Sequence, residues 1–108
     1  MPPTRILGRR RRTGIAYRLG ALYSLLPGDR DRALELLSLA ATGRRTDHNV
    51  RNANLYLSVL FEGESQWHVD WYRRKAIECS RNEESVDKDL AMIRRFYETV
   101  RRRGAAPN

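Results

Sequence analysis

The sequence has few of the residues on which disulfide-linked, metal-bound or membrane-spanning proteins depend. One cysteine, Cys79, among 108 residues excludes an internal disulfide and cannot by itself hold a structural zinc ion. The longest apolar run, Leu55–Phe61, is far shorter than the ~20 residues that a membrane span requires. We therefore expect neither a disulfide scaffold nor a membrane span.

Residues typical of catalytic sites are scarce as well. The chain has two histidines, His48 and His68, and Cys79 lies on an expected apolar helix face, where an inert buried thiol is the simpler interpretation. The sequence contains no glycine-rich phosphate loop and no cluster of residues at metal-ligand spacing. We expect no enzymatic activity, no cofactor and no metal.

The abundant residues are apolar and basic, and the basic ones gather at the ends. Hydrophobic residues make up 41% of the chain, which fits one globular domain, and the net charge is +8. Residues 1–28 carry six arginines and no acid, and residues 94–108 carry five arginines and one acid, whereas residues 29–93 are slightly acidic. Such ends suit a polyanion, because neutralised phosphates release counterions.

Two other interpretations of the basic ends stay open. Blocks of like charge are often solvated, disordered tails. An arginine-rich, acid-free N-terminus also resembles an organelle transit peptide, although serine and threonine are sparse there. We expect a cytoplasmic or nucleoid-associated protein, with organelle import left open.

Apolar periodicity and capping residues predict an all-α protein, a single compact domain of about five helices. The expected helices begin at Thr13, at Asp29 or Asp31, at Thr46 or Asp47, at Ser65 and at Ser85, and they end at Pro27-Gly28, Gly43, Gly63, about Ser80 and Gly104. The expected division is a basic arm over residues 1–12, a helical domain over 13–104 and a tail over 105–108, with flexible basic termini.

The apolar stripe of each helix predicts its buried face. The expected inward residues of the first helix are Ile15, Leu19, Leu22 and Leu26, and one residue from each helix is expected to be mostly buried: Leu19, Leu37, Leu57, Trp71 and Ile93. Exposure of two or more of these five would mean that the helix assignments or the monomeric state are wrong. The stripe of the last helix also fits a coiled-coil seam of two heptads, which would make a homodimer.

Residues Tyr17–Ala40 resemble a tetratricopeptide repeat. Leu19, Gly20 and Tyr23 match the Leu-Gly-x-x-Tyr pattern of its first helix, and Ala33 matches a packing position of its second. Leu55-Tyr56 follows Leu22-Tyr23 by 33 residues, a spacing typical of helical-hairpin repeats. The resemblance implies closely packed antiparallel helices and a protein-binding adaptor, but it assigns no ligand-binding residue.

The polar segment Gly43–Asn54 favours a different interpretation. It joins a short apolar helix through a glycine turn to the next helix, as a helix-turn-helix motif does, and arginine and asparagine recognise base edges. Asn49, Arg51 and Asn52 are candidates for a DNA groove, and Arg44 and Arg45 for phosphates. A capped, solvated helix start explains the segment equally well.

The leading hypothesis is a small nucleic-acid-binding regulator or accessory factor for DNA or RNA, and the alternative is a tetratricopeptide-like adaptor that binds an acidic protein partner. Trp67, Trp71 and Tyr72 are expected to fill the core rather than to stack bases. The candidate nucleic-acid-binding residues are Arg9, Arg10, Arg11, Arg12, Arg44, Arg45, Asn49, Arg51, Asn52, Arg101, Arg102 and Arg103.

Overall fold

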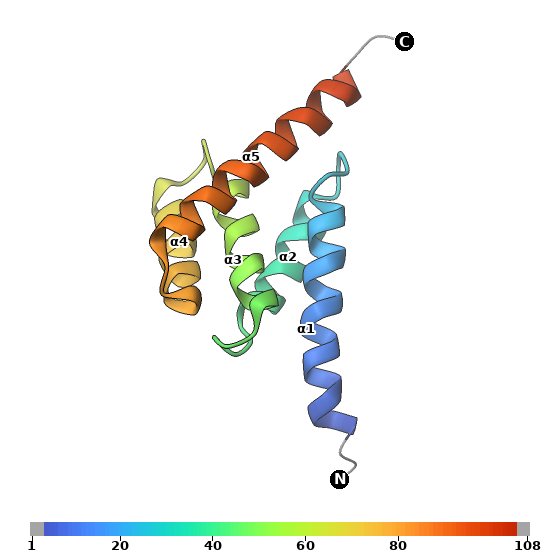
Figure 1. Cartoon of the computed structure of the whole chain (residues 1–108). Helices are drawn as coiled ribbons and strands as arrows, with labels where there is room; N and C mark the ends of the chain where they lie inside the picture. Colours follow the sequence, from blue (N-terminus) through green and yellow to red (C-terminus); the bar gives the residue numbers. More distant parts are fainter. Residues whose placement is uncertain (1–3, 106–108) are drawn as a thin grey trace.

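The computed structural model describes the backbone of residues 4–105 and the side chains of residues 12–104. This part of the chain contains helices and no strand, as predicted (Figure 1). The helices are α1 (Thr4–Tyr23), α2 (Arg30–Ala41), α3 (His48–Leu60), α4 (Gln66–Ser80) and α5 (Glu83–Ala105). None of them is both long enough and apolar enough to cross a membrane.

Helix α3 is the centre of the molecule and contacts all four other helices. Helices α1 and α2 form a hairpin on one side of it, and α4 packs on the other side (Figure 1). Helix α5 crosses this arrangement diagonally and contacts α3 and α4. The N-terminal part of α1 and the C-terminal part of α5 lie at opposite ends of the molecule, which measures 54 × 31 × 20 Å.

The core consists of two clusters that meet at α3. One cluster joins α1, α2 and α3, and the other joins α3, α4 and α5. Leu57 belongs to the first cluster and Leu55 to the second, so the apolar run of α3 supplies both. This run lies in the helix that the sequence predicted between Thr46 or Asp47 and Gly63.

Helix boundaries follow local chemistry, largely as expected. The side chains of Asp47 and Ser65 accept hydrogen bonds from the first turns of α3 and α4. Gly28 and Gly63 have φ values of 86° and 83°, which suit glycine in the turns that follow α1 and α3. Gly43 has no positive φ; instead, a Cβ there would lie 2.8 Å from Val50 Cγ2, so glycine allows a close approach.

Helices α1 and α5 are longer than the sequence predicted. Helix α1 begins at Thr4 rather than Thr13, because arginine is a good helix former and the run Arg9–Arg12 continues the helix. Helix α5 begins at Glu83 rather than after Ser85, since Asn82 caps it by accepting from the Ser85 amide. It also continues through Gly104 to Ala105, whereas residues 106–108 of the expected tail lie outside the described residues.

The predicted buried face of α1 is wrong. Ala16 and Gly20 face the core, whereas Ile15, Leu19, Leu22 and the following Leu26 are exposed. The reason is the close packing of the hairpin: a Cβ on Gly20 would lie 2.7 Å from Leu37 Cγ. Only the small side chains fit against α2, so the leucines of α1 face away from it.

Of the five residues expected to be buried, Leu37, Leu57 and Ile93 are buried. Leu19 and Trp71 are exposed, at 39% and 40%. The stripe of α5 that could form a coiled-coil seam begins with Val86, Leu90 and Ile93. These side chains are buried in the second core cluster and are not free to form such a seam. Leu19 and Trp71 both lie on helices that the sequence predicted, so their exposure points to apolar surfaces that a monomer leaves uncovered.

Candidate nucleic-acid interface

One group of arginines joins the helices through ion pairs with carboxylates. Arg51 on α3 lies 2.7 Å from Asp89 on α5, Arg73 on α4 bridges Glu83 and Asp87, and Arg94 on α5 pairs with Glu62. Arg30 on α2 pairs with Glu64 and donates to the Leu60 carbonyl. Hydrogen bonds from Arg73 lower the pKa of Asp87 below its ordinary value. These cations are already neutralised by acidic side chains of the same chain.

A second group of arginines makes no ion pair among the described side chains. Its members are exposed and lie on α1, on α2, in the α2–α3 loop, on α4 and beyond its end, and on α5: Arg12, Arg18, Arg32, Arg44, Arg45, Arg74, Arg81, Arg95, Arg101, Arg102 and Arg103. Exposed cations without an acidic neighbour attract polyanions. The basic excess of the sequence therefore appears on the surface as unpaired arginine.

The two terminal arginine clusters do not form one continuous surface. Arg9, Arg10 and Arg11 lie on the N-terminal half of α1, although their side chains are outside the described residues. Arg101, Arg102 and Arg103 are exposed on the last turns of α5. Figure 1 shows these helix ends at opposite ends of the molecule. A single short ligand cannot contact both clusters of one chain.

The α2–α3 segment has a mixed role. Arg44 and Arg45 are exposed in the loop, and Arg45 is close enough to Cys79, on the last turn of α4, to lower its pKa slightly against the larger raising effect of burial. Arg51 is committed to Asp89, and it also donates to Ser85 and to the Asn52 side chain. Asn49 is half-buried near Gly14 of α1. Asn49 and Arg51 on the first turns of α3 are therefore engaged within the domain, whereas the loop arginines Arg44 and Arg45 are accessible.

Two tryptophans form an exposed stack on α4, contrary to the prediction that they fill the core. Trp67 is 65% exposed and Trp71 is 40% exposed. Their rings are nearly parallel, with an interplanar angle of 8° and centroids 5.4 Å apart. The four-residue spacing places both side chains on one face of the helix. Lys75, one turn further, lies with its Nζ 4.7 Å from the Trp71 ring centroid.

Three partly buried rings, Phe61, His68 and Tyr72, pack together beneath the tryptophan stack. His68 stacks on Phe61 with centroids 4.4 Å apart, and its Nδ1 lies 2.6 Å from the capping Ser65 Oγ. Tyr72 also stacks on Phe61, with centroids 5.8 Å apart. Trp67 contacts His68 edge-on. The N-terminal half of α4 thus presents the tryptophans on a base of packed rings.

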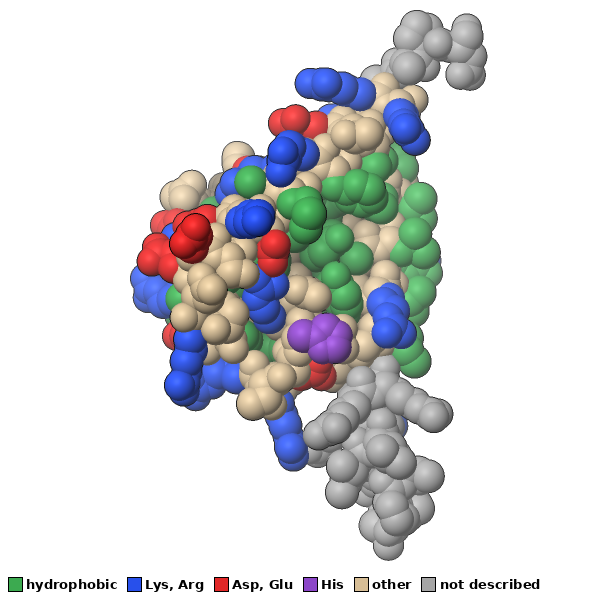
Figure 2. All heavy atoms as spheres, in the orientation of Figure 1, with side chains coloured by type: hydrophobic (Ala, Val, Ile, Leu, Met, Phe, Trp, Pro, Cys, Tyr) green, Lys and Arg blue, Asp and Glu red, His purple; other side chains and the backbone are tan. Residues whose placement is uncertain are grey.

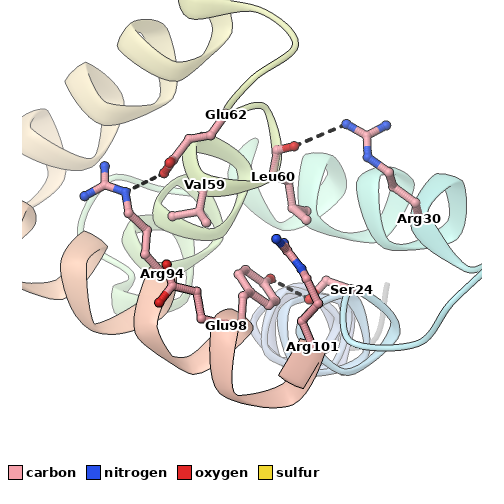
Figure 3. Close-up of a pocket in the computed structure, with 9 residues that line it drawn as sticks. Ser24, Arg30, Val59, Leu60, Glu62, Arg94, Glu98 and Arg101 are labelled. Atoms are coloured by element: carbon pink, nitrogen blue, oxygen red, sulfur yellow. Dashed lines mark hydrogen bonds and ion pairs between the residues drawn. The ribbon is translucent and has the colours of Figure 1, made fainter. Parts of the chain in front are cut away.

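A cavity of about 400 Å³ lies among the α1–α2 turn, the end of α3 and the middle of α5 (Figure 3). Arg30, Arg94 and Arg101 line it together with Glu62 and Glu98. Two of these arginines are neutralised by Glu62 and Glu64, and the close-up shows Arg94 directed at Glu62. Basic and acidic groups are balanced here, so the cavity has less attraction for an anion than the unpaired arginines outside it.

Three tyrosines connect α1, α3 and α5. Tyr17 contacts Tyr56 edge-on at 5.8 Å, Tyr56 contacts Tyr97 at 6.0 Å, and the Tyr97 hydroxyl lies 2.6 Å from Ser24 Oγ. Burial raises the pKa of all three phenols, that of Tyr17 to about 12. Burial also raises the pKa of the Cys79 thiol, which disfavours a reactive thiolate. The three tyrosines thus connect α1, α3 and α5 through ring contacts and the hydrogen bond to Ser24.

Sequence reasoning did name the tryptophans, but it assigned them to the core. Their four-residue spacing, with Lys75 one turn on, was the available signal for an exposed strip. Within the described side chains, no three histidine, cysteine or acidic residues are grouped to hold a metal ion. Comparison with family models, curated proteins and solved structures finds no match for this chain.

Proposed function

We propose that this protein binds single-stranded nucleic acid, with a base stacked on the face of Trp67 that Trp71 leaves free and the phosphate backbone held by unpaired arginines. The observation that carries the proposal is the exposed, parallel tryptophan pair on an otherwise basic protein. Single-strand binders combine aromatic platforms with a positive track, because every base has a flat face and every nucleotide a phosphate.

The exposure of the tryptophans is costly unless a ligand covers them. An aromatic side chain buries roughly 150–250 Å² when it packs, and this burial is a major source of stability in a small domain. Trp67 forgoes most of that gain at 65% exposure. A base stacked on the ring recovers it, at ~1–3 kcal/mol per base.

Cations continue the strip along α4. Lys75 lies against Trp71 and pairs with Glu78, so the unpaired cations of the strip are Arg74, which is exposed beside Lys75, and Arg45, which lies near the last turn of the helix. In this arrangement the strand runs from the tryptophans toward the α2–α3 loop, where Arg44 and Arg45 contact phosphates. The arginines at the ends of α1 and α5 add sequence-independent attraction.

The test uses the fact that Trp67 and Trp71 are the only tryptophans in the chain. Intrinsic fluorescence therefore reports on the proposed site alone, and we expect quenching by a single-stranded oligonucleotide but little by a duplex of equal charge. Phe96→Ala is the matched control, because Phe96 is an exposed aromatic residue on α5. Absence of binding to DNA and RNA at low ionic strength would contradict the proposal.

A second candidate function is a tetratricopeptide-like adaptor. Its support is the pattern of contacts: α1, α3 and α5 touch in succession, and α2 and α4 flank them, as stacked hairpins do. The positive-φ glycines Gly28 and Gly63 occupy equivalent turns in the two hairpins. An adaptor holding a peptide by apolar contacts would bind almost independently of salt, whereas a phosphate binder would not.

A further inference from the structure

The outer side of the α1–α2 hairpin carries the largest group of exposed aliphatic side chains among the described residues. We call it the leucine edge; it consists of Ile15, Leu19, Leu22, Leu26 and Leu39, which are 39–60% exposed. Figure 2 shows hydrophobic side chains running along the outer border of α1. A monomer rarely leaves such a continuous apolar strip to water.

The α1 and α2 parts of the leucine edge are contiguous. Arg32 of α2 lies over the ring of Tyr23 of α1, at 5.2 Å from its centroid, so these two helix faces are side by side. Leu19 is one turn before Tyr23, and Leu39 is two turns after Arg32. Both leucines therefore share the side of the hairpin on which Arg32 meets Tyr23.

We propose that the leucine edge binds a second copy of this chain, with the two α1 helices antiparallel. A twofold interface must be self-complementary. In an antiparallel pair centred between Gly20 and Ala21, Leu19 lies opposite Leu22 of the other copy, and Ile15 lies beside the turn after that copy's α1, which contains Leu26. The same register brings Leu39 of each copy to the same side of the interface.

Charge complementarity selects a second copy over an unrelated partner. Helix α1 carries no acid, so its unpaired Arg12 needs a carboxylate from elsewhere. Asp29 and Asp31 lie at the opposite end of the leucine edge and make no ion pair among the described side chains. In the antiparallel arrangement, the Arg12 end of one α1 lies beside the α1–α2 turn of the other copy, where Asp29 and Asp31 lie with Arg32 and with an Arg30 that Glu64 already neutralises.

The pairing leaves the tryptophans accessible. Helix α4 lies on the other side of α3 from the α1–α2 hairpin (Figure 1). A dimer would therefore present two tryptophan strips facing away from each other. The inference does not depend on the proposed function, since nucleic-acid binding can fail while the dimer persists.

The first test is analytical ultracentrifugation of the full chain over a wide concentration range. We expect a dimer for the wild type and a monomer for Leu19→Glu/Leu22→Glu, with dimer affinity reduced by more than about 100-fold. Met92→Glu is the matched control, because Met92 is equally exposed but lies on α5. Circular dichroism checks that each variant stays helical, and a wild type that is monomeric at every concentration would overturn the proposal.

The second test fixes the register through cysteine cross-linking in a Cys79→Ser background. Ile15→Cys and Leu26→Cys chains are oxidised separately and then together. We expect disulfide-linked heterodimers only in the mixture, because each position faces the other residue and not itself. Efficient homodimers of either chain alone, or no cross-link in the mixture, would overturn the antiparallel arrangement.

Discussion

Helices α4 and α1 flank the same central helix, and both direct large apolar side chains outward. On α4 these are the stacked Trp67 and Trp71, followed by Lys75. On α1 they are Ile15, Leu19 and Leu22, with no aromatic residue among them. Both faces were predicted to be core, and both lie on the surface.

The two faces differ in chemistry, so each favours a different class of partner. Flat rings beside cations match bases and phosphates, because stacking needs a planar face and a polyanion needs positive charge. Branched aliphatic side chains in a regular stripe match another stripe of the same kind, since they offer only apolar area and shape. We infer that α4 contacts a nucleic acid and that α1 contacts a second copy of the chain.

The largest expected effect is a difference in the free energy of unfolding between a buried leucine of α3 and an exposed leucine of α1. Leu57→Ala removes a fully buried side chain between α3 and its neighbours, and we expect a loss of ~2–5 kcal/mol in the free energy of unfolding. Leu22→Ala removes an exposed one, and we expect a loss below ~1 kcal/mol at protein concentrations where the chain is monomeric. Urea unfolding measures both, and equal losses would mean that α1 is packed differently.

The next effect separates the two outer faces by their ligands. Replacing Trp67 and Trp71 by alanine removes the stacking platform, and we expect ~1–3 kcal/mol weaker binding of single strands for each base that no longer stacks. Leu19→Glu/Leu22→Glu is expected to leave the intrinsic affinity of one chain for the strand unchanged while abolishing dimers. Fluorescence anisotropy with a labelled oligonucleotide, at protein concentrations below dimer formation, checks both expectations. A result in which the leucine variant loses affinity and the tryptophan variant keeps it would reverse the assignment.

A smaller effect concerns the arginines beside α4. Arg44→Gln/Arg45→Gln is expected to flatten the slope of log affinity against log salt by ~0.7 for each phosphate of a single strand that these arginines no longer neutralise. Arg51→Gln is the control, because Arg51 is already paired with Asp89 and contributes little free charge. Its effect is expected on stability, since the substitution breaks the bridge between α3 and α5. Titrations at several salt concentrations distinguish the two variants, and identical slopes for wild type and Arg44→Gln/Arg45→Gln would remove the loop from the site.

The smallest expected effect concerns the ionisation of Tyr17, which contacts Tyr56 where α1 packs on α3. Burial raises the pKa of Tyr17 from 10.0 to about 12, so the neutral phenol is favoured in the folded chain. The stability that this provides is complete below pH 10.0 and is lost as pH rises toward 12. Tyr17→Phe should therefore lose stability less steeply than wild type in this range. Alkaline titration followed by circular dichroism tests this, and parallel curves would show that Tyr17 ionises freely in the folded state.

Much of the fold was predictable from local chemistry. Caps at Asp47 and Ser65, the glycine turns at Gly28 and Gly63 and the four-to-three spacing of α5 are all properties of short segments. They fix where helices lie, because a cap or a turn needs only its immediate neighbours. Gly20 belongs to the pattern whose resemblance to a tetratricopeptide repeat implied closely packed helices, and Leu37 fills the space beside it.

The orientation of helices and the candidate site were less predictable. A stripe such as Ile15, Leu19 and Leu22 shows that one face is apolar, but not whether the cover comes from the same chain or another. On α1 the face with the small residues Ala16 and Gly20 turns toward the core, because small side chains let α1 pack closely against α2. Arg51 was predicted to contact a DNA groove because arginine recognises base edges. Its partner, Asp89, is 38 residues away, so local sequence patterns could not reveal the ion pair.

The central claim is that α4 binds single strands through its tryptophans, and the most direct measurement is an equilibrium titration of intrinsic fluorescence with an unlabelled single-stranded oligonucleotide. Because Trp67 and Trp71 are the only tryptophans, any quenching of tryptophan emission that follows binding arises on α4. We predict saturable quenching whose midpoint moves to higher oligonucleotide concentration as salt is raised, while the Phe96→Ala control behaves as wild type. Binding detected by anisotropy with no change in tryptophan emission would contradict the claim, since the strand would then lie elsewhere on the basic surface.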